Sequence, residues 1–325
     1  MDIIDKLKKE REKVDLELME LCSELKPSIL YDPIRHAVGI GGKRLRPILV
    51  RMVGRMINGT CNKNRYSSLA VELFHNFTLV HDDIMDNDDL RRGHETVHAK
   101  WDIATGVLAG DGIIGIAYEA LLREKCNSPV NLFKIFTRGV IEVCEGQGYD
   151  KEFETRSDVT MDEYLLMIYK KTAALIEVSS KIGAVCAGGD ENTIELCSEY
   201  GKALGMAFQI QDDCLDIMST EEKIGKNYGS DVSEGKKTYL YIKALEIFNE
   251  VDKLRYLNIM ENKVSDLKSI LEVKELYLRN GVIKEAETEI RNWIDKAYEI
   301  LDKLSLKYNT DELREFTGYL LNRDY

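Results

Sequence analysis

Two acidic clusters in the sequence have the residue types and the spacing needed to bind divalent metal ions. They occupy residues 82–86 (DDIMD) and 212–216 (DDCLD), each within an apolar helical segment. Residues four apart on a helix lie one turn apart on the same face, so each cluster presents neighbouring carboxylates. Magnesium is usually held by one or two carboxylates while phosphate oxygens and waters complete its shell. Together the clusters predict a site where metal ions clamp a diphosphate.

Short runs of cationic residues accompany these clusters. In residues 41–47 (GGKRLRP), glycine amides, a helix start and two long cations provide the features of an anion site. Arg91-Arg92-Gly93 follows the first cluster, and arginine can bind phosphate oxygens bidentately. Lys171, Lys226 and residues 235–238 (GKKT) add cations around the second cluster in the sequence. We therefore predict two anion pockets.

The elements that must position these residues are predicted to be helices. Apolar residues recur with helical spacing, strict alternation does not recur, and none of the four prolines follows Pro129. Capping boxes are predicted at residues 160–163 and 309–312. No linker-like stretch divides the chain. We therefore expect an all-α fold, in which residues 1–325 form a large single-domain helical bundle around a central cavity.

Composition argues against several classes of protein. A net charge of −12 repels polyanions, so no nucleic-acid partner is expected. The seven cysteines lack a C-x-x-C pair, which fits a reduced, cytoplasmic location. The N-terminus is charged, and Asp111 interrupts the most apolar stretch, residues 106–117. No transmembrane segment is therefore expected, since a span needs about 20 apolar residues.

The ordered motifs resemble those of trans-isoprenyl diphosphate synthases, the family of farnesyl and geranylgeranyl diphosphate synthases. The segments that carry this resemblance are GGKRLRP, DDIMDNDDLRRG, KKTAAL, FQIQDDCLD and GKNYGSDVSEGKKT, spanning about residues 39–238. The resemblance implies an isoprenoid-synthase fold, a homodimer, and two or three Mg²⁺ ions per active site. It also implies that isopentenyl diphosphate is condensed with an allylic diphosphate (dimethylallyl, geranyl or farnesyl) after metal-assisted ionisation.

Site residues are carried over from the family motif by motif. The residues implied for isopentenyl diphosphate are Lys43, Arg46, His75 and Arg92. Those implied for the allylic diphosphate are Arg91, Lys171, Thr172, Gln209, Lys226 and Lys236. The principal magnesium ligands are expected to be Asp82, Asp86 and Asp212, and the same catalytic motifs are completed by Asp83, Asp213 and Asp216. Gln147 and Asp150 resemble a family position near the reacting allyl group.

Product length is expected to depend on the residues one helical turn before the first cluster. These are Phe77 and Thr78, five and four positions upstream of Asp82. A single aromatic residue, five positions upstream, resembles the archaeal-type geranylgeranyl diphosphate synthases, whereas animal-type farnesyl synthases usually carry two. We therefore expect mainly geranylgeranyl diphosphate with some farnesyl diphosphate, and a farnesyl diphosphate synthase remains the alternative.

Some of the same residues also fit other classes of protein. Residues 72–75 (ELFH) and 95–98 (ETVH) both have the E-x-x-H pattern of ferritin-like di-iron proteins. That reading leaves both aspartate clusters and the phosphate-type cations unused. Terpene cyclases and head-to-head synthases also use acidic helical motifs, but the cations of residues 43–46 suit a second diphosphate. A non-catalytic subunit would not need both acidic motifs intact. His81, on an apolar helix, is interpreted as a packed core histidine.

Overall fold

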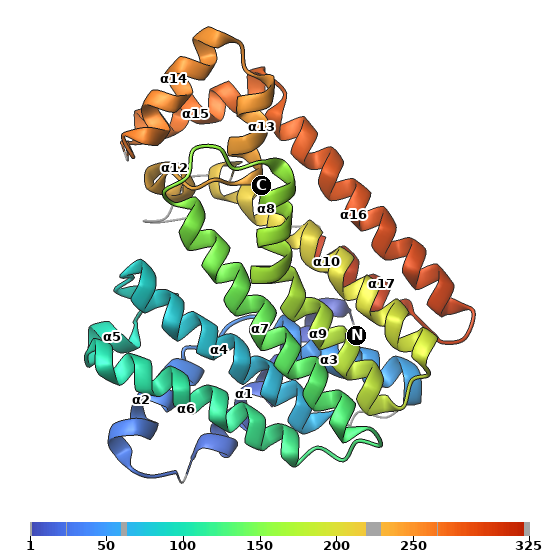
Figure 1. Ribbon diagram of the computed structural model, residues 1–325. Coiled ribbons are helices and arrows are strands. Elements are labelled where there is room, and N and C mark those ends of the chain that lie inside the picture. The colour runs from blue at the N-terminus through green and yellow to red at the C-terminus, as the bar shows by residue number, and fades with distance from the viewer. Residues whose placement is uncertain (1, 24, 60–63, 219–228, 265, 322–325) are drawn as a thin grey trace. The chain divides into compact units, whose positions relative to one another are not determined.

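The computed structural model describes residues 2–23, 25–59, 64–218, 229–264 and 266–321, and in these ranges the chain is almost entirely helical (Figure 1). The prediction of an all-α protein is confirmed. A single two-stranded ribbon occurs in the described ranges, formed by β1 and β2. The elements in chain order are α1 (Ile3–Cys22), α2 (Ser28–Gly39), α3 (Leu45–Asn58), α4 (Arg65–Asp86), β1 (Leu90–Arg91), β2 (His94–Glu95), α5 (Val97–Lys100), α6 (Ile103–Leu122), α7 (Pro129–Phe153), α8 (Met161–Ile168), the π-helical turn η1 (Tyr169–Ala173), α9 (Ala174–Ala187), α10 (Glu191–Met218), α12 (Ser230–Glu234), α13 (Tyr239–Ile247), α14 (Glu250–Glu261), α15 (Leu267–Arg279), α16 (Val282–Ser305) and α17 (Asp311–Leu321).

The backbone divides into two compact units. Unit 1 comprises residues 1–140, 178–198 and 304–315, and unit 2 comprises residues 141–177, 199–303 and 316–325. Each crossing from one unit to the other falls inside a helix, at α7, α9, α10, α16 and α17. The expectation of one domain over residues 1–325 stays a prediction, and each unit is described by itself.

Local capping residues set several helix starts. Thr160 accepts a hydrogen bond from the Glu163 amide while the Glu163 carboxylate accepts from Thr160, so the first predicted capping box is confirmed. The second differs from the prediction. Asn309 accepts from the Asp311 amide at 2.8 Å, and the Glu312 carboxylate is bound by the Arg55 guanidinium. Glu312 therefore forms an ion pair with a neighbouring helix and does not cap its own helix.

In unit 1, α4 packs extensively against α6, and α3 lies against α4 (Figure 1). Glycines permit the close contact of α4 with α6, since a Cβ at Gly110 would lie 2.2 Å from Nε2 of His81. The imidazole of His81 also contacts Phe77, with ring centroids 4.7 Å apart. His81 is therefore a packed histidine, as predicted.

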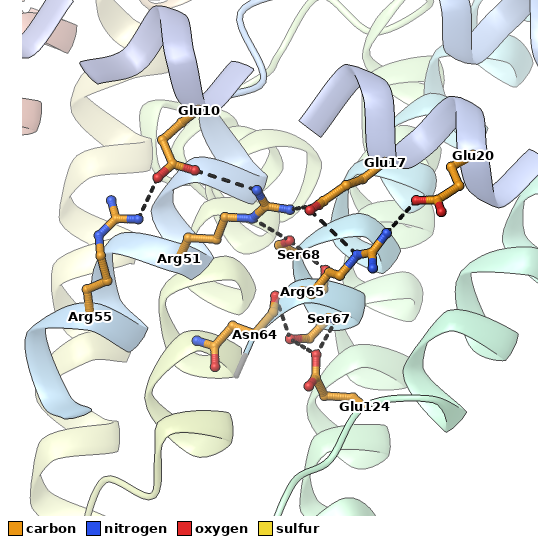
Figure 2. Close-up of polar contacts among 10 residues, drawn as sticks. All are labelled: Glu10, Glu17, Glu20, Arg51, Arg55, Asn64, Arg65, Ser67, Ser68 and Glu124. Carbon is orange, nitrogen blue, oxygen red and sulfur yellow. Dashed lines mark hydrogen bonds and ion pairs between the residues drawn. The ribbon is translucent and has the colours of Figure 1, made fainter. Parts of the chain in front are cut away.

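Helix α1 is attached to α3 and α4 through ion pairs (Figure 2). Arg51, whose side chain is 2% exposed, binds Glu17, and Arg55 binds Glu10 at 2.8 Å. Arg65 binds Glu20 at 2.6 Å. Because guanidinium groups at this depth lose water contacts, they need the carboxylates of α1 as partners.

Unit 2 has its own apolar core. It is built from residues of α8, α10 and α13–α16, including the fully buried Tyr164 and Tyr256. The hydroxyl groups of Tyr256 and Tyr277 hydrogen-bond at 2.8 Å. The hydroxyl groups of these two tyrosines are therefore satisfied, as buried hydroxyl groups require.

One helix of the described chain, α6, is long and apolar enough by composition to cross a membrane. Of its most apolar window, 44% is buried within the protein. Core helices of proteins that never enter a membrane pass the same test, so this is weak evidence for a span.

Candidate active site

The first acidic cluster lies in unit 1 at the C-terminal end of α4. The helix stops after Asp86 because Asn87 adopts a left-handed conformation (φ 58°), which asparagine tolerates better than most residues. Asp83 is buried, and its carboxylate accepts a hydrogen bond from Arg91. Burial raises the pKa of Asp83 even though the Arg91 charge acts in the opposite direction. Asp82 is half-buried and Asp86 is exposed, so these two carboxylates differ from Asp83 in keeping solvent access.

Arg91 and Arg92 lie on a hairpin that was not predicted from the sequence. Strands β1 and β2 pair antiparallel, with Arg91 opposite His94. Arg92 (φ 53°) and Gly93 (φ 80°) form the two-residue turn, and positive φ at both positions suits the twist of a hairpin. Strands of two residues are too short to show alternating polarity in the sequence. The glycine after Arg92 was the sequence feature that could have indicated a turn.

The glycine loop before α3 approaches this hairpin within unit 1. Gly41 (φ 82°) and Gly42 (φ 145°) lead into α3, so the prediction that this segment opens a helix is confirmed. The Arg92 guanidinium donates a hydrogen bond to the Gly41 carbonyl oxygen. A Cβ at position 42 would lie 2.3 Å from Nη1 of Arg92. Glycine is therefore required at position 42 for the arginine to approach the loop.

His75 lies beside Arg46, whose Nη1 is 3.2 Å from the imidazole Nε2. Burial, followed by the charges of Arg46 and Arg92, lowers the pKa of His75 well below its ordinary value. The ring is therefore neutral near pH 7, and Nε2 can accept from the Arg46 guanidinium. Arg46 therefore contacts His75, and Arg92 contacts the glycine loop that carries Lys43.

Arg44, in the same loop, has a structural role. Its side chain is 2% exposed and donates to Glu72 at 2.6 Å and to Asp15 at 2.8 Å. A di-iron site would need Glu72 as a ligand, but this carboxylate is bound to the guanidinium. The geometry therefore does not support the di-iron alternative.

The second acidic cluster lines a cavity in unit 2. The cavity has a volume of about 490 Å³. It is bordered by polar and apolar side chains from α7, α8, η1, α10, α12 and the segment between α12 and α13, namely Asp150, Tyr164, Met167, Ile168, Lys171, Thr172, Gln209, Asp212, Asp213, Leu215, Asp216, Ser230, Asp231, Lys236, Lys237 and Thr238. All the residues of unit 2 that were assigned to the allylic diphosphate or to the second acidic cluster lie here, apart from Lys226, which is outside the described residues.

The three aspartates of this cluster differ in their surroundings. Asp213 is buried and accepts from the Tyr164 hydroxyl, from Nε2 of Gln209 at 3.0 Å and from the Tyr239 amide at 3.0 Å. Burial raises its pKa to about 6 although these donors act the other way. Asp216 accepts from the amides of Ser230 and Asp231 at 3.2 and 3.1 Å. Both carboxylates therefore accept from the protein's own donors, which suits supporting positions, and all three aspartates line the cavity.

A π-helical turn positions Lys171, one of the cationic side chains that line the cavity. Backbone contact explains its position, since a Cβ at Gly146 would lie 2.2 Å from the Lys171 amide nitrogen. On another side, a Cβ at Gly205 would lie 2.6 Å from the Cα of Ala173. Lys171 forms an ion pair with Asp150, and Thr172 donates to Gln209 at 2.8 Å. π-Helical turns frequently occur at functional sites.

Asp231 is a cavity residue that the sequence analysis did not assign. Burial, followed by the charges of Asp216 and Asp213, raises its pKa well above the ordinary value, while Lys236 acts in the opposite direction. The nearest cation is Lys236, whose Nζ is 3.8 Å from the Asp231 carboxylate. Its position between two glycines of the motif GSDVSEG was a signal in the sequence. Gln147, which with Asp150 was expected from the resemblance to lie near the reacting allyl group, has both amide atoms buried without a hydrogen-bond partner in the described structure.

Phe77 and Thr78 are half-buried on α4 in unit 1. The ring of Phe77 packs between those of Phe74 and His81, with centroid separations of 6.3 and 4.7 Å. Thr78 donates its hydroxyl to the backbone carbonyl of His75 at 2.8 Å. Core packing and product-length control are both compatible with these contacts, so the assignment stays a prediction.

Comparisons with known proteins agree with the sequence resemblance. A geranylgeranyl pyrophosphate synthetase from Pyrococcus horikoshii matches with a TM-score of 0.90 and 35% identity, covering 99% of this chain and 98% of that one. A short chain isoprenyl diphosphate synthase of Methanothermobacter thermautotrophicus is 37% identical over 326 residues, covering 100% of both chains. A geranylgeranyl diphosphate synthase of Sulfolobus acidocaldarius is 40% identical over 300 residues, covering 89% of this chain and 90% of the relative.

The helical architecture is that of the isoprenoid synthases, a class of all-α transferases. Residues 27–277 match the polyprenyl synthetase family model. The chain belongs to the polyprenyl synthetase family, whose members are prenyltransferases that extend allylic diphosphates with isopentenyl diphosphate. Enzymes of this family are generally metal-dependent.

Proposed function

We propose that this chain is a magnesium-dependent geranylgeranyl diphosphate synthase that uses dimethylallyl, geranyl and farnesyl diphosphates as primers. The main support is the unit 2 cavity, where Lys171, Thr172, Gln209 and Lys236 lie along the same lining as Asp212. Cations and a carboxylate in one small cavity are suited to a diphosphate whose oxygens share a metal ion with the protein. The names of the archaeal relatives add support for this product.

The donor set of the cavity fits magnesium. Its carboxylate oxygens are hard ligands, and of the three aspartates that line it we propose Asp212 as the principal ligand, as the family resemblance implies. In unit 1 we propose Asp82 and Asp86 as the corresponding ligands. Two or three ions per site follow from the family resemblance. When bound, magnesium supplies positive charge that stabilises the departing diphosphate.

The proposed chemistry assigns binding and charge stabilisation to the side chains. Arg91, Lys171, Lys226 and Lys236 hold the allylic diphosphate and oppose the charge that builds on it as the carbon–oxygen bond ionises. Lys43, Arg46, His75 and Arg92 hold isopentenyl diphosphate, whose double bond attacks the carbocation. The released diphosphate then accepts the proton. His75, kept neutral by burial and by the charges of Arg46 and Arg92, acts as a hydrogen-bonding group in this scheme.

We propose a C20 product with some C15, because Phe77 places one aromatic ring a turn before the first acidic cluster. Replacing Phe77 with Ser should shift the product distribution to longer chains, since the ring would no longer block the growing tail. Product length is measured by chromatography after removal of the diphosphate. Exchange of Phe74, which is fully buried, for Leu serves as the control. Unchanged products from the Phe77→Ser variant would remove this ring from the proposal.

The enzyme is further proposed to be a cytoplasmic homodimer that binds small diphosphate substrates and no nucleic acid. None of the six cysteines in the described ranges forms a disulfide, which fits a reducing compartment. Helix α6 exposes apolar side chains, among them Leu108 (60%) and Leu122 (73%), which could be covered by a second copy.

The activity is tested by incubating the full chain with isopentenyl diphosphate and magnesium together with each allylic primer in turn. Release of diphosphate and formation of a C20 product, both lost in a chelator and restored by magnesium, are the expected results. Condensation that stops at C15 would support the farnesyl diphosphate synthase alternative. Cyclic products, or primer ionisation that does not require isopentenyl diphosphate, would contradict the proposal.

A further inference from the structure

Two cysteines of unit 1 meet at a place remote in sequence from every residue assigned to prenyl transfer. Cys126 lies in the loop between α6 and α7, and Cys186 lies in the last turn of α9. The Cys126 thiol donates to the carbonyl oxygen of Val185 at 3.8 Å, which places it next to Cys186. The two thiols also lie close enough to shift each other's pKa. The loop therefore brings the Cys126 thiol beside the helix end that carries Cys186.

The two thiols differ in their access to solvent. Cys186 is 5% exposed, whereas Cys126 is half-buried in a surface loop. Ser67, which lies near Cys186, is held in place because Glu124 accepts from its amide at 2.7 Å and from its hydroxyl at 2.9 Å (Figure 2). A reagent can therefore reach Cys126, while Cys186 is held behind it.

The surroundings of Cys126 also favour its thiolate. The hydrogen bond from Cys186 lowers the pKa of Cys126 to about 6, burial opposes this shift, and the Ser128 amide, 3.4 Å from the sulfur, assists it. The carboxylate of Glu124 is the neighbouring charge that acts against the thiolate. Burial and the same thiol contact raise the pKa of Cys186. A thiolate that is accessible and next to a second thiol is the arrangement found in redox-sensitive cysteines.

We propose that Cys126 and Cys186 are a reversible, peroxide-sensitive thiol pair that closes into a disulfide joining the α6–α7 loop to the end of α9. The Cys126 thiolate attacks a peroxide oxygen, the O–O bond breaks, and hydroxide leaves, so that Cys126 becomes a sulfenic acid. The Cys186 thiol then attacks that sulfur, forming the S–S bond and releasing water. The pair loses two electrons to the peroxide, and the two thiol protons end in water. A dithiol reductant reverses the change.

The test uses the full-length protein with stoichiometric hydrogen peroxide, followed by alkylation and trypsin digestion without reductant. The expected product is a cross-link between fragments 126–134 and 182–202, with fragmentation assigning it to Cys186 and not to Cys197, and dithiothreitol should remove it. Cys144→Ser, which removes an exposed cysteine outside the pair, is the matched control and should still form the cross-link. The disulfide should raise Tm by roughly 5 °C, since a long loop is closed.

Two variants separate the proposal from non-specific oxidation. Cys126→Ser should abolish the cross-link and leave prenyl transfer unchanged. Cys186→Ser should leave a Cys126 sulfenic acid that dimedone traps, and it should move the half-maximal pH for alkylation of Cys126 upward from about 6. Oxidation mainly at Cys144, a sulfinic acid on Cys126 in the unaltered protein, or a Cys126–Cys126 link between two copies would each overturn the proposal.

Discussion

At the scale of single residues, the aspartates of one motif have different roles. Asp213 accepts from Tyr164, Gln209 and the Tyr239 amide, and its neighbour Asp212, which lines the same cavity, is the proposed metal ligand. The spacing of acidic residues in the sequence does not distinguish Asp212 from Asp213. Their separation comes from helix geometry, because adjacent residues on a helix point about a quarter turn apart.

Replacing Asp212 with Asn should lower kcat by roughly 10²- to 10³-fold, the range seen when one group that stabilises transition-state charge is lost. The amide keeps the shape but loses the negative charge that attracts magnesium. Steady-state kinetics across a magnesium titration measures the effect, with part of the loss recovered at high magnesium. Asp295→Asn, an exposed acid on α16, is the control and should behave as the unaltered enzyme. Equal activity of both variants would remove Asp212 from the metal site.

His75 should make stability depend on pH. Its folded pKa lies well below the ordinary value, so on acidification the unfolded chain binds a proton that the folded chain does not. The free energy of unfolding should therefore fall as pH drops through the ordinary histidine range near 6.5. Denaturant titrations at pH 7.5 and 5.5 measure this fall. It should be smaller in His75→Gln than in a variant of the exposed His94, and an identical fall in both would contradict the assignment.

At the scale of elements, the π-helical turn shows how close backbone contact presents a binding residue. The pair Lys171-Thr172 was recognisable in the sequence, but the π-helical geometry of this turn was not. That geometry depends on Gly146 of α7 and Gly205 of α10, which lie far from the turn in the chain. The ribbon that carries Arg91 and Arg92 was missed for a related reason. Short elements leave little periodicity, and their turns are set by one glycine.

Substituting Ala for Gly146 should displace Lys171 and raise the KM for the allylic substrate roughly tenfold, because the added Cβ would lie 2.2 Å from the Lys171 amide. The KM for isopentenyl diphosphate should stay close to its original value. Gly148→Ala on the same helix is the matched control, since a Cβ there meets nothing within 4 Å. A similar rise in both KM values would indicate a general loss of structure and no specific positioning of Lys171.

At the scale of the whole molecule, apolar periodicity was enough to predict an all-helical protein and helices such as α4 and α10, whereas the prediction of a prenyltransferase depended on the resemblance of its motifs to a known family. The two-unit division was not visible in the sequence. Its boundaries fall inside helices, where composition does not change, so no linker signal exists. The grouping of Lys171, Gln209 and Lys236 around one cavity was anticipated through resemblance, whereas Asp231 became evident from the cavity itself.

If α6 forms the proposed dimer contact, Leu108→Lys should produce monomers, because a charge would have to be buried in an apolar interface. Light scattering coupled to gel filtration should give twice the mass of one chain for the unaltered protein. Leu306→Lys is the control, as this leucine is 90% exposed outside α6. A monomeric unaltered protein, or a dimer that persists in the Leu108 variant, would exclude this face of α6.

The ion pairs that attach α1 limit how the chain can be shortened. A truncated version beginning at Ser28 would take away the carboxylates of Glu10, Asp15 and Glu17 while keeping Arg44 and Arg51, each with a side chain only 2% exposed. Arg44 would keep Glu72 as a partner, whereas Arg51 would lose both Glu10 and Glu17, and leaving a buried charge without its partner costs about 3–5 kcal/mol. The first helix, although outside the residues that match the family model, therefore supplies counter-ions on which the folding of unit 1 depends.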